Sequence, residues 1–325
     1  MNILVTGCAG FIGYNVCKLI LSKKNNYQIF GIDNINKYYD VNLKNKRIVS
    51  LKNNFNNFSF NKIDIRDIKK LNNFFSKNKI KLVVHLAAQA GVRHSLKKPK
   101  DYIDNNIVGF YNVLESSKLN EIDHLIYAST SSVYGESKKF PLKEKNNTDK
   151  PVSFYAATKK CNEILAYSYS HNYDLKCTGL RFFTAYGPYG RPDMALYKFT
   201  EAIFKNKKSE IYNYGNHIRD FTYVDDVANY IYRLIKKPNV KKNHQIFNIA
   251  SGKPKKLKEF IKLVEKYCNK KLIFNSVKMQ QGDIYKTHGD ISKISKYLNY
   301  RKNTSLEIGI QNFIKWYKEY NKYDK

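Results

Sequence analysis

Residues 7–13 read GCAGFIG, and this stretch decides the expected fold. It follows the apolar segment Ile3–Thr6, which has the length of a buried strand, and it opens the helical pattern Ile12–Ser22. The GxxGxxG spacing is a variant of the dinucleotide fingerprint, in which glycines allow a tight turn and a close approach of the backbone to a pyrophosphate. The free N–H groups and positive dipole end of the following helix favour that anion. The stretch therefore predicts a dinucleotide site at Gly7, Gly10 and Gly13.

An acidic residue at the end of the next expected strand supports the same site. Asp33 lies 20 residues after Gly13, at the spacing where a carboxylate accepts hydrogen bonds from a ribose. Because a carboxylate repels a 2′-phosphate, Asp33 favours NAD over NADP. We therefore expect NAD as the cofactor.

The first half of the chain alternates short apolar runs with helical patterns. Strands separated by helices predict a parallel sheet with right-handed crossovers, and hence an α/β fold of the Rossmann-type, doubly wound class. The expected strands are Ile3–Thr6, Gln28–Ile32, Phe58–Ile63, Leu82–Leu86, His124–Ala128 and Lys176–Leu180, and the helical patterns include Ile12–Ser22, Tyr102–Ser117 and Tyr155–Tyr169.

The rhythm changes after about Arg181. Helices and short strands then mix with basic loops, which predicts a smaller C-terminal α/β substrate lobe. We expect an NAD-binding domain at residues 1–180 and the substrate lobe at residues 181–325, with some of the later segments returning to the sheet. The helices expected in this half are Ala195–Phe204, Val224–Ile235, Leu257–Tyr267 and Glu307–Tyr320.

The composition argues against membrane, secreted and metal-binding proteins. The chain has 325 residues, of which 42% are hydrophobic, and no apolar run approaches the ~20 residues of a membrane span. No basic segment precedes the glycine motif, as a signal peptide would require, so we expect a cytoplasmic protein. Its five cysteines form no CxxC pair, which favours reduced structural thiols and no metal site.

The formal net charge of +31 raises the alternative of nucleic-acid binding. Lysines are spread along every segment and interleaved with asparagines, which indicates biased amino-acid usage rather than a binding stripe. We therefore expect attraction of anionic small molecules but no specific nucleic-acid partner. Retention on heparin that disappears at modest salt would identify nonspecific charge.

Three polar residues form a candidate catalytic set. Tyr155 and Lys159 have YxxxK spacing on one face of an expected helix, where an ammonium group stabilises a phenolate and lowers the pKa of the tyrosine. Thr130 follows an apolar strand, at the carboxyl edge where doubly wound sheets bind ligands. A tyrosine of this kind can accept a proton from a sugar hydroxyl while hydride leaves for a nicotinamide.

These motifs occur in order with familiar spacing: TGxxGxxG from Thr6, HLAAQ at residues 85–89, the serine and threonine run at 129–132, and YxxxK. From residue 2 to about residue 300 the chain resembles the extended short-chain dehydrogenase/reductase family of nucleotide-sugar epimerases and dehydratases. The resemblance implies tightly bound NAD and a catalytic triad of Thr130, Tyr155 and Lys159. With Tyr155 and Lys159, the residues that it implies around the cofactor are Gly7, Gly10, Phe11, Ile12, Gly13, Asp33, Asn34, Asp64, Ile65, Leu86, Ala87, Ala88, Gln89, Asn105 and Phe183.

The two residues after Thr130 discriminate among the reactions of this family. Its dTDP-glucose dehydratases carry an Asp-Glu pair there, and its UDP-glucuronate decarboxylases carry a glutamate at the second position. This chain has Ser131 and Ser132, which are not general acids or bases near neutral pH without an activating partner. Oxidation at C4, rotation of the ketone and return of hydride need only the catalytic triad and NAD, so we expect a 4-epimerase.

Three segments resemble UDP-glucuronate 4-epimerases, including the bacterial capsule-biosynthesis type: DNINKYYD at 33–40, GVRHS at 91–95 and FFTAYGPYGRPDMA at 182–195. A sugar carboxylate favours a bidentate guanidinium, so Arg191 with Thr184 and Ser131 is the candidate set for it. Arg93 is a second candidate, for the carboxylate or a phosphate. We hypothesise that a firm hold on the carboxylate also prevents decarboxylation of the β-keto acid formed at C4.

The nucleotide end has its own family segments. RDFTYVDD at 219–226 places Arg219 where the family contacts the diphosphate, and QGD at 281–283 places Asp283 where it contacts the uridine ribose. Some members have a second phosphate-binding arginine three residues before that aspartate, but this chain has Gln280. Phosphate binding is then expected to depend more on Arg219 and nearby lysines.

Two other readings stay open at this point. One is a 4-epimerase for neutral UDP-glucose or UDP-N-acetylglucosamine, which loss of the Arg191 role would favour. The other is a catalytically silent NAD-binding protein, against which the complete triad argues. The resemblance also implies a homodimer, formed through the helices Tyr102–Ser117 and Tyr155–Tyr169.

Overall fold

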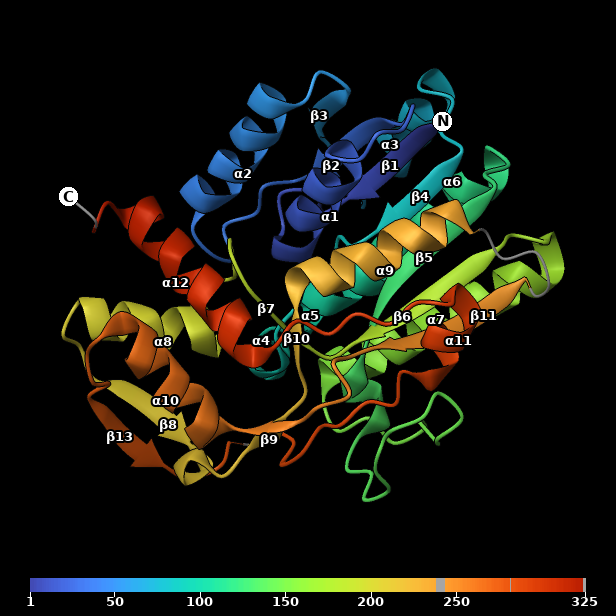
Figure 1. Cartoon of the computed structure of the whole chain (residues 1–325). Helices are drawn as coiled ribbons and strands as arrows, with labels where there is room; N and C mark the ends of the chain where they lie inside the picture. The colour runs from blue at the N-terminus through green and yellow to red at the C-terminus, as the bar shows by residue number, and fades with distance from the viewer. Residues whose placement is uncertain (238–242, 281, 324–325) are drawn as a thin grey trace.

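A computed structural model describes residues 1–237, 243–280 and 282–323 of the chain. At its centre is a parallel sheet of seven strands in the order β11-β6-β5-β4-β1-β2-β3 (Figure 1). The chain moves outward in opposite directions from β1 and β4, so the switch point that opens a ligand crevice lies between these two strands. The doubly wound sheet expected from the sequence is confirmed. The strands are β1 (Asn2–Thr6), β2 (Gln28–Asp33), β3 (Phe58–Lys62), β4 (Leu82–His85), β5 (His124–Thr130), β6 (Cys177–Phe182) and β11 (His244–Ile249).

Helices cover both faces of the sheet because its strands are apolar on both sides. In β1, Ile3 and Val5 belong to one buried cluster and Leu4 belongs to another, as the two-residue period of a strand requires. Figure 1 shows α9 and α1 in front of the sheet, with α2 beside them. The front helices are α1 (Phe11–Leu21), α2 (Val41–Asn54) and α9 (Val224–Lys236), and those packed in the other cluster are α3 (Ile68–Lys77), α6 (Gly109–Leu119) and α7 (Phe154–Tyr173).

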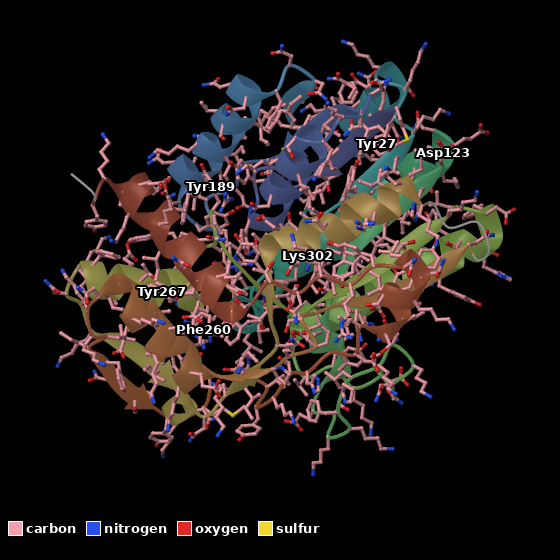
Figure 2. The ribbon with its side chains drawn as sticks, viewed as in Figure 1. Tyr27, Asp123, Tyr189, Phe260, Tyr267 and Lys302 are labelled. Atoms are coloured by element: carbon pink, nitrogen blue, oxygen red, sulfur yellow. The ribbon has the colours of Figure 1, made fainter. Side chains whose placement is uncertain are left out.

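The C-terminal lobe lies at the lower left of Figure 1 and has its own apolar cluster. Phe260, labelled in Figure 2, stacks on Phe221 with ring centroids 4.3 Å apart. This lobe contains α8 (Ala195–Phe204), α10 (Leu257–Cys268), α12 (Leu306–Asn321) and the paired strands β8 (Ser209–Tyr212) and β13 (Phe274–Val277).

The C-terminal half of the chain also returns to the sheet, as expected. Strand β11 pairs with β6, and α9 packs against α1. The boundary expected between residues 180 and 181 falls inside β6. Tyr189, labelled in Figure 2, joins the two parts, because its ring lies 4.5 Å from that of Tyr14 on α1 and 4.9 Å from that of Trp316 on α12.

The helix expected at Tyr102–Ser117 is interrupted by a wider π-helical turn. The chain forms α5 (Pro99–Tyr102), the π turn Ile103–Val108 and then α6. Such turns are uncommon and occur often at functional sites, and this one carries Asn105.

Shorter elements complete the structure. Two strand pairs bridge the sheet and the lobe, and two short helices flank the sheet. These elements are β7 (Thr184–Tyr186) with β10 (Phe221–Tyr223), β9 (Ile218–Arg219) with β12 (Lys255–Lys256), α4 (Val92–Lys97), α11 (Ser292–Leu298) and the 3-10 turns Ser131–Tyr134 and Asn213–Gly215. Among the described residues, no helix is long and apolar enough to cross a bilayer.

Candidate active site

A cavity of about 810 Å³ lies between the carboxyl edge of the sheet and the C-terminal lobe. Its position is the one that strand order predicts for a ligand in a doubly wound fold. Every candidate site residue from the sequence lines it except Asp64. These are Gly7, Gly10, Phe11, Ile12, Gly13, Asp33, Asn34, Ile65, Leu86, Ala87, Ala88, Gln89, Arg93, Asn105, Thr130, Ser131, Tyr155, Lys159, Phe183, Thr184, Arg191, Arg219 and Asp283.

The glycine loop joins β1 to α1 at one end of the cavity. Gly7 has a φ of +71°, and a Cβ atom there would lie 2.6 Å from the backbone nitrogen of Ala87. Gly10 caps α1 without a side-chain hydrogen bond, so the first N–H groups of the helix have no side-chain cap. The loop therefore brings bare backbone and a helix N-terminus to the cavity wall, which fits a pyrophosphate.

Asp33 ends β2 beside this loop. Its carboxylate accepts hydrogen bonds from the Ala9 N–H at 3.2 Å and the Ile35 N–H at 2.8 Å. Burial raises the pKa of Asp33, and these N–H groups and Lys44 oppose that rise. The carboxylate is thus held at the loop by backbone donors, where it can accept from a ribose hydroxyl.

Two cations of α2 accompany Asp33, and sequence reasoning missed both. The Lys44 ammonium donates to the carbonyl oxygen of Asn36 at 2.6 Å, and burial lowers its pKa to about 8. Arg47 is fully buried and donates to the carbonyl oxygens of Ala9 at 2.7 Å and Tyr189 at 2.6 Å. Arg47 therefore ties the glycine loop to the segment that precedes Arg191. Lys44 and Arg47 lie three residues apart among the apolar residues of α2, and this spacing could have predicted their burial. Lysine and arginine at such positions are usually solvent-exposed, however.

Asp64 lies outside the cavity wall. Its carboxylate accepts two hydrogen bonds from the Arg66 guanidinium, at 3.0 and 2.7 Å, and one from the Asn34 amide at 3.0 Å. These bonds lower the pKa of Asp64 to about 2 despite its partial burial. Asp64 therefore acts on the site through Asn34, which does line the cavity.

The π turn holds the loop after β4 in place. The Asn106 side chain accepts from the Gln89 N–H at 2.8 Å and donates to the Gln89 carbonyl oxygen at 3.1 Å. The same amide group donates to the Thr158 hydroxyl at 3.0 Å, on the helix that carries Tyr155. One buried asparagine thus links the cofactor wall to the catalytic helix, with Asn105 beside it facing the cavity.

Thr130, Tyr155 and Lys159 all line the cavity. Thr130 ends β5 and hydrogen-bonds the Tyr155 phenol, and Lys159 donates to the Ala128 carbonyl oxygen at 3.0 Å. Burial raises the pKa of Tyr155, while Thr130 and the positive charge of Arg191 lower it; burial also lowers the pKa of Lys159 to about 8. The expected lowering of the Tyr155 pKa by Lys159 therefore does not appear in the chain by itself, because the ammonium is directed to a carbonyl oxygen.

Arg191 lies on the loop between β7 and α8, in a partly buried ion pair. Its Nε donates to Asp193 Oδ1 at 2.9 Å and its Nη2 donates to Asp193 Oδ2. Burial opposes the charge of Arg191, but Asp193 more than offsets this and raises the pKa of the guanidinium. Arg191 is therefore a permanent cation in the wall next to Tyr155.

A cluster of basic groups surrounds Asp283 at the other end of the cavity. Arg219 Nη2 lies 3.1 Å from its carboxylate, His217 Nε2 lies 3.4 Å from it and Arg93 Nη2 lies 4.0 Å from it. His217 is buried and was missed from the sequence, because a lone histidine has no characteristic spacing. Gln281 of the QGD segment lies outside the described residues.

This geometry joins a dinucleotide loop to a tyrosine–lysine pair on a parallel sheet, and comparison with known proteins identifies the family. A model of the NAD dependent epimerase/dehydratase family matches residues 3–250. The chain belongs to the NAD dependent epimerase/dehydratase family. Its dinucleotide is therefore NAD.

Relatives in this family extend over the whole chain. "Protein CapI" of Staphylococcus aureus is 43% identical over 99% of this chain and 100% of its own length. A UDP-glucuronate 4-epimerase of Thermodesulfobacterium geofontis is 41% identical over 97% of this chain and 96% of its own. The crystal structure of the Bacillus cereus UDP-glucuronic acid 4-epimerase with UDP-glucuronic acid and NAD has a TM-score of 0.92 at 34% identity, covering 98% of this chain and 100% of that one.

The residues of the cavity fit NAD in both of its halves. The bare backbone at Gly7 suits the pyrophosphate and Asp33 suits a ribose diol, and Ala87, Tyr155 and Lys159 are among the lining residues that would hold the remainder of the dinucleotide. Among the described residues no group of three or more histidine, cysteine or acidic side chains is arranged to hold a metal ion.

Proposed function

We propose that this protein is a UDP-glucuronate 4-epimerase, which interconverts UDP-glucuronate and UDP-galacturonate with tightly bound NAD. The observation that carries the proposal is a partly buried guanidinium, Arg191, in the same cavity as Thr130, Tyr155 and Lys159. Close relatives with this name match the chain from end to end. The arrangement supplies an oxidoreductive site and a cation for an acidic sugar.

Tyr155 is the acid–base group in this proposal. Its phenolate takes the proton of the sugar C4 hydroxyl and later returns it, while Thr130 hydrogen-bonds the phenol and orients it. Lys159 is buried and donates to the Ala128 carbonyl oxygen in the chain by itself, and in this proposal its ammonium would stabilise the phenolate once the ligands are bound. When bound, NAD supplies the reversible acceptor of hydride from C4.

Ser131 and Ser132 limit the chemistry to epimerisation. They occupy the 3-10 turn after Thr130, and the Ser132 N–H donates to the Thr130 hydroxyl at 3.2 Å. Among the described residues, neither serine hydrogen-bonds to a carboxylate. Elimination of water and decarboxylation therefore lack an acid or base at these two positions.

Arg191, Thr184 and Ser131 form the proposed carboxylate site. All three line the cavity, and Thr184 sits on β7 in register with Phe221 of β10. A guanidinium binds a carboxylate through two parallel hydrogen bonds, which also fixes its orientation. Holding the C5–carboxylate bond away from alignment with the C4 ketone would suppress loss of CO₂.

Arg219, Arg93 and Asp283 form the proposed nucleotide end. The two arginines approach Asp283 in the structure, and Lys286 lies on the same wall. Two cations beside an acid suit a diphosphate next to a ribose diol. Arg93 comes from α4 and thereby compensates for the glutamine at position 280.

We also infer a homodimer in the cytoplasm. Tyr111 on α6 and Ile164 and Tyr167 on α7 are about half exposed on two adjacent helices, which supports pairing through this face. The five unpaired thiols suit a reducing compartment. The oligomeric state is checked by light scattering of the purified chain.

The test is turnover of UDP-glucuronate without added NAD, followed by proton NMR, with UDP-glucose as a parallel sample. We expect UDP-galacturonate from the first sample and no turnover in a Tyr155→Phe variant. Turnover of UDP-glucose alone would assign the neutral UDP-hexose alternative. A UDP-pentose product would contradict the argument from the two serines, and no turnover even with NAD supplied would favour a silent NAD-binding protein.

A further inference from the structure

Three segments singled out in the sequence meet beside Arg191. Tyr38 belongs to the stretch at 33–40, Gly91 begins the stretch at 91–95, and Asp193 belongs to the stretch at 182–195. The Tyr38 hydroxyl donates to Asp193 Oδ2 at 3.4 Å. A Cβ atom on Gly91, whose φ is +111°, would lie 2.5 Å from the Tyr38 hydroxyl oxygen, so any other residue there would have to displace this phenol.

The ion pair uses one edge of the Arg191 guanidinium and leaves the other without a carboxylate. A guanidinium has five N–H donors arranged in a rigid plane. Asp193 accepts one from Nε and one from Nη2, which together form one edge of that plane. The other edge, formed by Nη1 and the second hydrogen of Nη2, can still donate two parallel hydrogen bonds to a second carboxylate. Among the described residues, no second carboxylate bonds to the Arg191 guanidinium, whose other polar neighbour is the Tyr38 hydroxyl.

Tyr38 fixes the acid in turn. Its ring centroid lies 5.7 Å from the guanidinium carbon of Arg191 and 5.0 Å from the ring centroid of His94. Burial and the neighbouring Asp193 raise the pKa of Tyr38, so its hydroxyl remains a donor at neutral pH. All three groups, Tyr38, Arg191 and Asp193, line the cavity that contains Tyr155.

We propose that Asp193 and Tyr38 are positioning residues that select for an acidic sugar by holding the Nη1–Nη2 edge of Arg191 toward the sugar carboxylate. The inference rests on the proposed function and deepens it. Asp193 then does not compete with the substrate, because the two carboxylates use different edges. A longer-range consequence is that the segment at 33–40, which begins with the NAD-binding Asp33, also contributes to sugar specificity.

The experiment compares dissociation constants of UDP-glucuronate, UDP-glucose and UDP by calorimetry in a Tyr155→Phe background, where no turnover occurs. The quantity of interest is the preference for UDP-glucuronate over UDP-glucose. We expect Asp193→Asn to reduce this preference about tenfold or more, because an amide cannot accept both N–H groups and the guanidinium is freed to rotate. Tyr38→Phe should reduce it less, and Asp193→Glu should restore part of it.

The control is Glu210→Gln, which removes a carboxylate from the wall of the same cavity without touching Arg191. It should leave the preference unchanged even if all UDP ligands bind slightly tighter. Affinity for UDP itself should stay the same in the Asp193 and Tyr38 variants, which excludes a general loss of structure.

The outcomes separate this inference from the proposed function. A preference that rises in Asp193→Asn would show that Asp193 competes with the substrate, and an unchanged preference would show that it has no role; either overturns the inference. If Arg191→Met also retains the preference and the unmodified protein does not epimerise UDP-glucuronate, the proposed function fails as well.

Discussion

The carboxylate of Glu163 on α7 accepts two hydrogen bonds from the Arg181 guanidinium on β6. Nε donates to Oε1 and Nη2 donates to Oε2, each at 2.8 Å. Each side chain is only 3% exposed, and the Ser129 hydroxyl adds a third bond to Oε1 at 2.7 Å. Ser129 precedes Thr130, and Glu163 lies one helical turn after Lys159. Together with the Ser129 bond, this buried pair therefore fixes α7, which carries Lys159, against β5, which carries Thr130.

Breaking the pair should destabilise the protein strongly. We expect Glu163→Gln to lower the free energy of unfolding by about 3–5 kcal/mol, because it leaves a buried guanidinium without a counter-charge. Urea unfolding measures the change. Glu201→Gln is the matched control, since its partner Lys205 is exposed and the loss should be about 0–1 kcal/mol. Similar losses in the two variants would contradict the structural role of Glu163.

Replacing Gly7 should release NAD from the protein, whereas replacing Gly252, which has the same backbone conformation, should not. Gly7 and Gly252 share a φ of +71°, but an added Cβ would lie 2.6 Å from backbone at Gly7 and no nearer than 3.7 Å to any atom at Gly252. Gly252→Ala should cost about 1–2 kcal/mol of stability from backbone strain alone. Gly7→Ala should cost more and carry little NAD, measured as nucleotide released on denaturation. Full NAD content in Gly7→Ala would be inconsistent with close packing at this loop.

Asp33 should determine the preference for NAD over NADP. Removing its charge in Asp33→Asn takes away the repulsion of a 2′-phosphate and leaves Lys44 nearby to attract it. We expect the ratio of NADP to NAD affinity to rise about tenfold or more, as measured by titration of the nucleotide-free protein. Asp67→Asn serves as the comparison, because Asp67 pairs with Lys70 at the surface and does not line the cavity, and it should leave the ratio unchanged. An equal rise in both variants would remove the special role of Asp33.

The stability of the NAD-free protein should depend on Lys159 at alkaline pH. Burial lowers the pKa of Lys159 to about 8 in the folded chain, whereas the unfolded value is about 10.4. Between these values the unfolded chain binds a proton that the folded chain does not, so stability contributed by this group rises with pH. Lys159→Met should remove that rise and Lys205→Met should not, as measured by urea unfolding at about pH 8 and pH 10. If the free energy of unfolding changed equally with pH in the unmodified protein and in Lys159→Met, the lowered pKa of a buried Lys159 would be contradicted. Lys44, also with a pKa of about 8, should act in the same direction.

The sequence predicted the sheet and the dinucleotide loop because both are local. The glycines at 7, 10 and 13, the acid 20 residues later and the alternation of apolar runs with helices each follow from short-range sterics and periodicity. Strand order, the return of β11 to the sheet and the cavity at the carboxyl edge agree with those patterns. The π turn at Ile103–Val108 was not predicted, because one extra residue in a helical turn leaves almost no trace in apolar spacing.

Only the tertiary structure determined the partners of the charged residues. In a chain with 58 lysines and arginines, no pattern distinguishes Lys44 and Arg47 from solvent-exposed cations, and only folding buries them beneath the glycine loop. Arg191 could be identified as a candidate cation, but the edge that it presents depends on Asp193 and on Tyr38 from a segment more than 150 residues away. Local sequence determines which backbone conformations form, whereas the direction and pKa of an ionisable group depend on charges and burial that distant segments bring together.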